Sequence, residues 1–383
     1  MSDRRRERAL RFLDGESPER PVCLQTYLGL FLENRRRHAL ADIYRGMLGD
    51  STEMTLSFEQ VSEAQLAAWE AAWSALRRPP AWMPVRGWPT NSAEGTRVLL
   101  EHDRVLVAPP GAEPVDVVYA ATASDRDIWD RREAVDTDAM PDPPTLREAL
   151  ADGWAEHPRR FVDRWGEEYL IHGHIGTPYG AAYSRLGFGG MMEAMVTEPE
   201  LLEAIIDNHL RHLVTRLEIY AEAGVECVFV EETLSSSDLI SEVDYLRFSF
   251  RSTRELLQHA RDQGLRTVYY YCGAVENRLH HLGQIPADAL AFEESKKGFD
   301  IDLTRVREEI GADRPLLGNI DAVLIRDGSD RAVLRAVEEQ FAAAGPLLAT
   351  SAGSPLTPDT GTRRMDFLVR ITEECRCEAA SDQ

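Results

Sequence analysis

Three apolar or aromatic runs in the C-terminal half of this chain end abruptly in polar groups or glycine. They are Thr267–Gly273 (TVYYYCG), Pro315–Asp321 (PLLGNID) and Pro346–Gly353 (PLLATSAG). Each run follows a helical stretch and precedes another. A repeat of strand, polar end and helix is typical of a parallel α/β barrel, which builds its site at the C-terminal ends of its strands. The pattern therefore predicts a fold and the location of a functional site.

Length and charge narrow the class of protein. An α/β barrel with insertions reaches 383 residues, and a hydrophobic content of 43% is enough for a large core. The net charge of −22 disfavours nucleic acid and anionic membranes as partners, because proteins that bind polyanions carry basic patches. We interpret the basic runs Arg4–Arg6 and Arg35–Arg37 as solvated helix faces. A small-molecule substrate is the expected partner.

Targeting signals and cysteine usage predict a cytoplasmic protein. No stretch approaches the ~18 consecutive apolar residues of a transmembrane helix, and the charged N-terminus lacks a signal-peptide pattern. The five scattered cysteines predict reduced thiols and no disulfide framework. Lys296 and Lys297 are the only lysines of the chain, which we interpret as a mark of GC-rich coding.

The strand–helix rhythm predicts that residues 1–383 form a single (β/α)8 TIM barrel domain. Eight strands are expected, at Pro21–Tyr27, Glu53–Phe58, Tyr169–His174, Val225–Glu231, Thr267–Cys272, Ala289–Phe292, Pro315–Ile320 and Leu347–Ser351. Short alternating runs and many prolines predict a β-rich meander inserted over residues 79–144. Residues 376–383 are expected to form a disordered tail. An open doubly wound sheet is disfavoured because no Gly-rich turn follows the first strand.

Several short motifs resemble those of one superfamily. Gly318–Asp321 (GNID) resembles the Gly-Asn-hydrophobic-Asp turn of the uroporphyrinogen decarboxylase superfamily, which also holds cobalamin- and thiol-dependent methyltransferases. Further stretches resemble that superfamily in the same order, at Arg6–Val22, Gly173–Pro178, Glu222–Glu226, Tyr271–Gly273 and Thr357–Pro358. The resemblance covers residues 4–375 and implies an α/β barrel and a homodimer.

The same resemblance implies a zinc site that this sequence does not keep. The methyltransferases of the superfamily bind zinc with His-x-Cys on the fifth strand and a Cys on the eighth. Here those positions are Tyr270, Cys272 and the neighbourhood of Ser351. Zinc takes three or four N, S or O donors, and Tyr and Ser are poor replacements. The Arg-rich first loop of the decarboxylases is Leu24–Gly29 here, without Arg. We favour no cofactor, with zinc or a corrinoid as the alternative.

The candidate catalytic residues are His174, Glu231, Tyr270 and Cys272. Tyr270 and Cys272 lie two apart on one strand and so face the same way. Histidine serves as a base near neutral pH, tyrosine as a proton donor, and a carboxylate beside an apolar wall as an acid. Glu231 and Glu232 are adjacent on a strand, so at most one of them enters the pocket. If a metal is bound, Cys272, His174 and Glu231 are the expected ligands.

The predicted substrate-binding residues are Tyr27, His172, Arg185, Glu294, Asn319, Asp321 and Ser351. Arg185 is the Arg close to the third-strand loop and suits a carboxylate. Asn319 and Asp321 lie in the family turn, where capping of a turn or helix is the alternative role. The backbone after Ser351 offers N–H groups to an anion.

Three functional hypotheses follow. The first is a superfamily enzyme that acts on a carboxylated small molecule by acid–base chemistry of the lyase class, decarboxylation included, without the family zinc site. The second is a corrinoid- or thiol-linked methyltransferase with a rearranged metal site. The third is a non-catalytic barrel that serves as a binding protein, a role that suits the degraded motifs.

Overall fold

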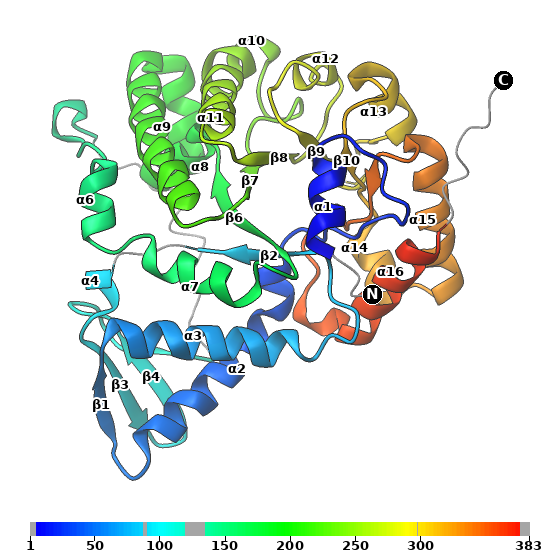
Figure 1. The fold of residues 1–383 in the computed structure, drawn as a ribbon. Helices are drawn as coiled ribbons and strands as arrows, with labels where there is room; N and C mark the ends of the chain where they lie inside the picture. The colour runs from blue at the N-terminus through cyan, green and yellow to red at the C-terminus, as the bar shows by residue number, and fades with distance from the viewer. Residues whose placement is uncertain (1–4, 87–89, 119–134, 297, 376–383) are drawn as a thin grey trace.

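The central element of the protein is a curled parallel sheet, seen here in a computed structural model that describes residues 5–86, 90–118, 135–296 and 298–375 (Figure 1). The sheet has seven strands in the order β11-β10-β9-β8-β7-β6-β2. They are β2 (Trp82–Val85), β6 (Leu170–Gly176), β7 (Cys227–Glu232), β8 (Arg266–Tyr271), β9 (Ala289–Phe292), β10 (Leu316–Leu317) and β11 (Leu348–Ala349). The tail predicted over residues 376–383 lies outside the described residues.

An irregular segment around Cys23 lies between the two edge strands of this sheet. Beside β11, Leu24 N donates to Thr350 O at 3.1 Å and Thr350 N donates to Val22 O at 2.9 Å. Beside β2, Ala81 N donates to Cys23 O at 3.1 Å. The fold is therefore α/β and TIM-barrel-like, with the expected first strand reduced to a short bridging segment.

The prediction for the second strand is wrong. Glu53–Leu56 is β1, which pairs antiparallel with β3 (Thr96–Glu101) in a separate four-stranded sheet of order β1-β3-β4-β5. The place beside β6 belongs to β2 instead. This strand contains Pro84, and a proline cannot donate a ladder hydrogen bond, so its sequence is typical of a loop.

The inserted meander predicted over residues 79–144 is not confirmed as a unit. Its strands β3, β4 (Arg104–Ala108) and β5 (Val115–Asp116) do pair antiparallel. However, β3 also pairs with β1, which lies outside this range, and β2 within it belongs to the parallel sheet. Residues 119–134 lie outside the described residues.

Helices surround the parallel sheet, and many of them begin at a capping side chain (Figure 1). Ser57 caps α3 in a capping box with Gln60, and Thr177 caps α8 ahead of Pro178. The helices are α1 (Arg5–Leu13), α2 (Leu28–Leu48), α3 (Phe58–Trp73), α4 (Thr90–Ala93), α6 (Leu146–Ala151), α7 (Glu156–Trp165), α8 (Pro178–Thr197), α9 (Pro199–Glu222), α10 (Glu242–Asp244), α11 (Arg251–Asp262), α12 (Leu279–Leu282), α13 (Leu303–Ile310), α14 (Ala322–Asp327), α15 (Asp330–Ala344) and α16 (Thr362–Glu374). Short helical turns are η1 (Thr137–Ala139), η2 (Tyr245–Phe250) and η3 (Pro358–Thr360).

Two apolar cores stabilise the described part of the chain. The larger one joins the parallel sheet to its helices. The smaller one includes Leu40, Tyr44, Phe58, Val98 and Val105, and it packs α2 and α3 against the antiparallel sheet. Figure 1 shows this second group as a lobe at one side of the parallel sheet. Among the described residues, no helix is long and apolar enough to cross a membrane.

His157 is a buried histidine of α7 that hydrogen-bonds Ser62 of α3, with Nδ1 and Oγ 2.8 Å apart. Burial, with Arg160 and Arg36 nearby, lowers the pKa of His157 to about 3. The unfolded chain takes up this proton near pH 6.5 and the folded chain does not, so stability is lost as the pH falls below 6.5. We predict a loss of about 2 kcal/mol from this group at pH 5, measured by urea unfolding at pH 7.5 and pH 5.

A His157→Gln variant should show a shallower decline of unfolding free energy over the same pH range. His280→Gln, at an exposed histidine, serves as the control and should leave the slope unchanged. Identical slopes for the wild type and His157→Gln would contradict the assignment.

Candidate functional site

A cavity of about 1030 Å³ lies between the strand ends of the parallel sheet and the lobe formed by α2, α3 and the antiparallel sheet. One wall carries side chains from β6, β7 and β8 and from the loops that follow β8, β9 and β11. The facing wall carries α2 residues, including Arg36 and Arg37. Its volume suits a small organic ligand or a coenzyme-sized one.

The register of the parallel strands gathers the ionisable residues on the cavity wall. His174 of β6 is opposite Phe229 of β7, and Glu231 of β7 is opposite Tyr270 of β8. Alternate residues of a strand share a face. For that reason Phe229 and Glu231 both line the cavity, as do Tyr270 and Cys272.

Glu231 is the centre of a hydrogen-bonded group. Its Oε1 accepts from the Tyr27 hydroxyl at 2.5 Å, and its Oε2 lies 2.8 Å from His174 Nε2. An ionised carboxylate only accepts, so this arrangement places the His174 proton on Nε2. Nδ1 is then the ring nitrogen that Glu231 does not engage, on a residue that lines the cavity.

Tyr27 is held in an unusual backbone conformation. Its φ is 55° and its ψ is 31°, in the left-handed region that non-glycine residues seldom adopt, and it directly precedes α2. Such strain is concentrated at functional sites, where the surrounding contacts maintain it. Burial, with Tyr270 and Glu231 nearby, raises the pKa of the Tyr27 hydroxyl, which keeps it a hydrogen-bond donor.

Tyr270 lies against Tyr27 and Phe229, with ring centroids 5.5 and 5.7 Å away. Its hydroxyl donates to the Gly353 carbonyl at 2.5 Å. A side chain at position 353 would clash with Glu294, so glycine is required for this close approach. The Tyr270 proton is thus engaged with the backbone in this structure, and its role as a proton donor stays a prediction.

Cys272 and His172 line the cavity in uncharged forms. Burial and the charge of Glu293 raise the pKa of the Cys272 thiol. Burial, with His174 nearby, lowers the pKa of His172 to about 3. The His172 ring packs on Trp82 at a centroid distance of 4.2 Å, and its Nδ1 is buried without a partner among the described residues. His172 is thus a neutral wall residue with one unmatched nitrogen.

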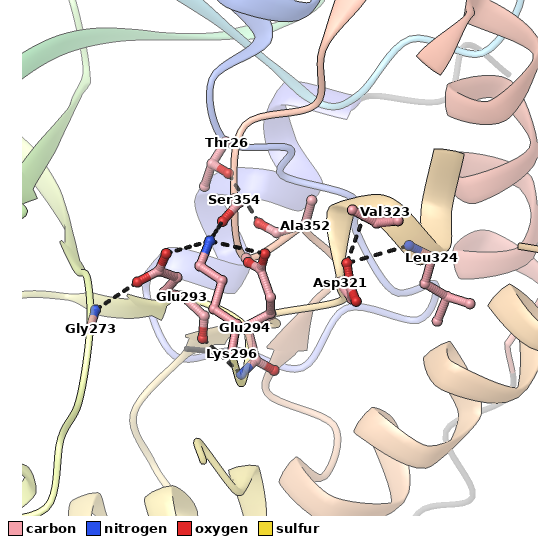
Figure 2. A network of polar contacts seen from close by, with 12 residues as sticks. Thr26, Gly273, Glu293, Glu294, Lys296, Asp321, Val323, Leu324, Ala352 and Ser354 are labelled. Atoms are coloured by element: carbon pink, nitrogen blue, oxygen red, sulfur yellow. Dashed lines mark hydrogen bonds and ion pairs between the residues drawn. The ribbon is translucent and has the colours of Figure 1, made fainter. Parts of the chain in front are cut away.

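A second polar group, built around Lys296, adjoins the cavity (Figure 2). The Lys296 ammonium lies 2.5 Å from Glu293 Oε1, 3.2 Å from Glu294 Oε1 and 2.5 Å from Ser354 Oγ. Burial alone would lower the pKa of Lys296, but its bonds and attraction to both glutamates raise it. The ammonium therefore stays charged. Glu293 also accepts from Gly273 N at 2.9 Å, which ties the end of β8 to the loop after β9.

Three predicted substrate-binding residues make contacts within the protein. Asp321 caps α14 by accepting from Val323 N at 2.7 Å, which is the capping alternative. Asn319 Nδ2 donates to Glu293 O at 3.1 Å. Ser351 is fully buried, with its hydroxyl 3.1 Å from Thr26 N and 3.0 Å from Ala352 O.

Arg185 and Glu294 also lie outside the lining of the large cavity. Arg185 lies on α8. Burial lowers the pKa of His209 on α9 to about 4, and the nearby charge of Arg185 adds to this decrease. Glu294, with Asn319 and Asp321, borders a separate cavity of about 300 Å³.

The zinc ligands implied by the family do not fit this geometry. The Tyr270 hydroxyl donates to a carbonyl, Ser351 is turned into backbone contacts, and only Cys272 keeps a family donor at the cavity. The alternative set of Cys272, His174 and Glu231 shares the cavity. Yet within the described ranges no three His, Cys, Asp or Glu side chains form a metal-binding group.

Sequence reasoning missed several cavity residues. We interpreted Arg36 and Arg37 as part of a solvated helix face. Both residues in fact line the cavity, and each donates a hydrogen bond to Glu33. Lys296 was ascribed to coding bias, although its rarity in an Arg-rich chain was the signal that could have identified it. No sequence pattern indicated that Ser354 would contact Lys296.

Glu232, the neighbour of Glu231, points away from the cavity and is fully buried. Its carboxylate accepts from Thr177 Oγ1 at 2.7 Å, Ser249 Oγ at 2.9 Å and Leu234 N at 2.9 Å. Burial raises its pKa, although these bonds oppose the rise. We predict that Glu232→Ala lowers the free energy of unfolding by about 3 kcal/mol, because three buried donors lose their acceptor.

Chemical unfolding of Glu232→Gln provides the comparison, since the amide keeps one acceptor and should cost less. Glu276→Ala is the exposed control: its carboxylate bonds Ser237, and its loss should change stability by no more than about 0.5 kcal/mol. An alanine variant at 232 as stable as wild type would refute the structural role.

Comparison with known proteins identifies the relatives of this chain. Residues 130–375 match the family model described as uroporphyrinogen decarboxylase (URO-D). A methylated-thiol–coenzyme M methyltransferase from Methanosarcina mazei is 24% identical over 177 residues, which are 46% of this chain and 46% of that protein. The matched region thus spans about half of that relative.

A solved structure, a methyltransferase from Methanosarcina mazei, has the same fold. It superposes with a TM-score of 0.63 at 18% sequence identity, covering 97% of this chain and 98% of its own. Together with the family match over more than half of the chain, this shows that the protein belongs to the uroporphyrinogen decarboxylase family.

Proposed function

We propose that the protein is an enzyme that acts on a small carboxylated molecule by acid–base chemistry of the lyase type, decarboxylation included. The observation that carries the proposal is the Glu231 carboxylate, which holds Tyr27 and His174 at 2.5 and 2.8 Å on the wall of a large cavity. A carboxylate, an imidazole and a phenol in one hydrogen-bonded group are the components of proton transfer near neutral pH.

Each member of this group has a defined part in the proposal. Glu231 orients the imidazole and stabilises its cationic form, as a carboxylate does in other histidine-based sites. His174 moves the proton through the ring nitrogen that Glu231 does not bind. Tyr27 donates to Glu231 and so keeps the carboxylate in place between two donors.

In the decarboxylation step, the bond between the substrate carbon and its carboxyl carbon breaks and CO2 leaves. The electron pair stays on the substrate carbon, and the imidazolium of His174 delivers the proton that completes the C–H bond. The aromatic wall of Phe229 and Tyr270 favours this step, because an apolar surrounding destabilises a carboxylate relative to neutral CO2. His174 then regains a proton from water at the cavity, so the reaction consumes one proton and needs no oxidant or reductant.

A second anionic group of the substrate is suited to α2. Arg36 and Arg37 line the cavity about 14 Å along the helix from Tyr27, at 1.5 Å per residue. Glu33 accepts from both guanidinium groups, so the three side chains together carry a net positive charge. Arginine binds carboxylates well through paired N–H donors. A cytoplasmic location and a homodimer remain predictions.

Methyl transfer is the second candidate function, and the names of the relatives favour it. One is a methylated-thiol–coenzyme M methyltransferase and the other a methyltransferase. In this reading Cys272 on the cavity wall takes part, and zinc or a corrinoid is the cofactor to consider. The donor set for zinc is poor, as described for Tyr270 and Ser351, which is why we place this candidate second.

The first candidate is tested with carboxyl-13C-labelled aromatic and aliphatic acids. We expect at least one acid to raise the melting temperature of the wild type and to release 13CO2. With that acid, Glu231→Gln and His174→Ala should slow CO2 release by about 10²- to 10⁴-fold, the usual contribution of general acid–base catalysis. The acid should still raise the melting temperature of both variants, because Arg36 and Arg37 on α2, which we propose bind it, are unchanged.

Glu242→Gln is the matched control, because Glu242 forms a similar pair with His281 at 2.7 Å away from the cavity lining. It should release CO2 at the wild-type rate. A Glu231→Gln variant that converts the acid as fast as the wild type does would contradict the proposal. Binding without turnover by the wild type would instead favour the non-catalytic barrel.

The second candidate is tested with 13C-methyl-labelled methanethiol and coenzyme M, with and without added Zn2+ and cobalamin. Methyl transfer is then followed by NMR. If this candidate is right, the wild type forms methyl-coenzyme M and Cys272→Ser loses at least about tenfold in rate. Full activity in the Cys272→Ser variant would exclude a role for this thiol.

A further inference from the structure

Lys296 is one of only two lysines in a chain whose other basic residues are all Arg. Its ammonium has three oxygen neighbours, on Glu293, Glu294 and Ser354 (Figure 2). An ammonium has three donors in a compact tetrahedral array, whereas a guanidinium is a flat fork. The geometry around Lys296 thus uses every donor of a lysine and suits an arginine poorly.

The oxygen atoms around Lys296 are withdrawn from water. Glu293 is 5%, Glu294 6% and Ser354 9% exposed. Two buried carboxylates are costly without a positive charge between them, since each loses its hydration. In addition, Glu294 Oε2 is a buried carboxylate oxygen without a hydrogen-bond partner among the described residues. The cage therefore has more oxygen acceptors than the ammonium has donors.

The cage is joined to the ends of two other strands, β8 and β11. Glu293 accepts from the backbone N–H of Gly273, which directly follows Cys272. Ser354 lies three residues beyond Ser351, and Gly353 between them accepts from Tyr270. The cage thus links the end of β8 and the loop after β11 to a cation supplied by the loop after β9.

We infer that Lys296 is a built-in cation of this site, and that its ammonium occupies a position between Glu293, Glu294 and Ser354 where a divalent metal ion would otherwise bind. The charge holds together the end of β8, the loop after β9 and the loop after β11. It does so without a dissociable ion. Lys296 is therefore a positioning residue, and this role is independent of the reaction proposed above.

Removal of the ammonium should convert the cage into a metal site. The carboxylates of Glu293 and Glu294 remain, including the unpartnered Glu294 Oε2, and carboxylate oxygens are donors that Zn2+ accepts, with water completing its coordination. We expect Lys296→Met to bind Zn2+ about tenfold or more tightly than the wild type in titration calorimetry. We also expect one additional zinc per chain by mass spectrometry, and a rise in melting temperature on adding Zn2+ that the wild type does not show.

Three comparisons make the test specific. Lys296→Met combined with Glu294→Gln should lose the gained zinc, because one carboxylate is removed. Lys296→Arg keeps the charge and should gain none. Arg335→Met removes the charge of an exposed ion pair with Glu339 and should behave as wild type. Where the methionine variant does not fold, Lys296→Gln replaces it, since its amide still donates to Glu293.

The inference is overturned if neither Lys296→Met nor Lys296→Gln gains zinc over the wild type. It is equally overturned if the wild type binds zinc as tightly as these variants, or if Arg335→Met gains the same ion. None of these outcomes depends on a substrate. A failure here is therefore distinguishable from a failure of the proposed acid–base function.

Discussion

The parallel register of β6, β7 and β8 decides what the cavity contains. Glu231 is opposite Tyr270, and His174 is opposite Phe229, so a shift of one residue in any strand would exchange the cavity wall for the helix-facing side. The adjacent carboxylates of β7 show the consequence. Glu231 faces Tyr27 and His174, whereas Glu232 is buried among hydroxyl donors on the opposite face. One strand end thus places one carboxylate on the cavity wall and buries the other.

The lobe of α2, α3 and the antiparallel sheet completes the site that the strands begin. Tyr27 enters α2 with a left-handed backbone and reaches Glu231, while Arg36 lies about two and a half turns further along the helix. The cavity therefore has carboxylates near the strand ends and guanidinium groups on α2. This arrangement suits the proposed molecule with two anionic groups, one of them the reacting carboxylate near His174 and the other at the guanidinium groups of α2.

Local patterns predicted the strands that carry most of the chemistry, and they failed where long side chains decide the geometry. The period-two alternation in Thr267–Cys272 correctly placed Tyr270 and Cys272 on one face, because strand pleating is local. β2 was missed because of its proline. Arg36 and Lys296 were missed for another reason: their positively charged ends reach the cavity from a helix and a loop, and only tertiary packing sets those directions. Amino-acid composition does not indicate where the charged end of a long side chain lies.

The protonation states of the cavity residues limit which groups can exchange a proton. Burial raises the pKa values of Tyr27, Tyr270 and Cys272, and carboxylate neighbours raise that of Lys296, so all four keep their protons at neutral pH. Burial also keeps His172 neutral. Glu231 and His174 share a hydrogen bond on the wall of the same cavity, where both can meet a bound molecule. Separate environments for neighbouring titratable groups are how an enzyme assigns acid and base roles, and the fixed protonation of their neighbours is what supports the roles proposed for Glu231 and His174.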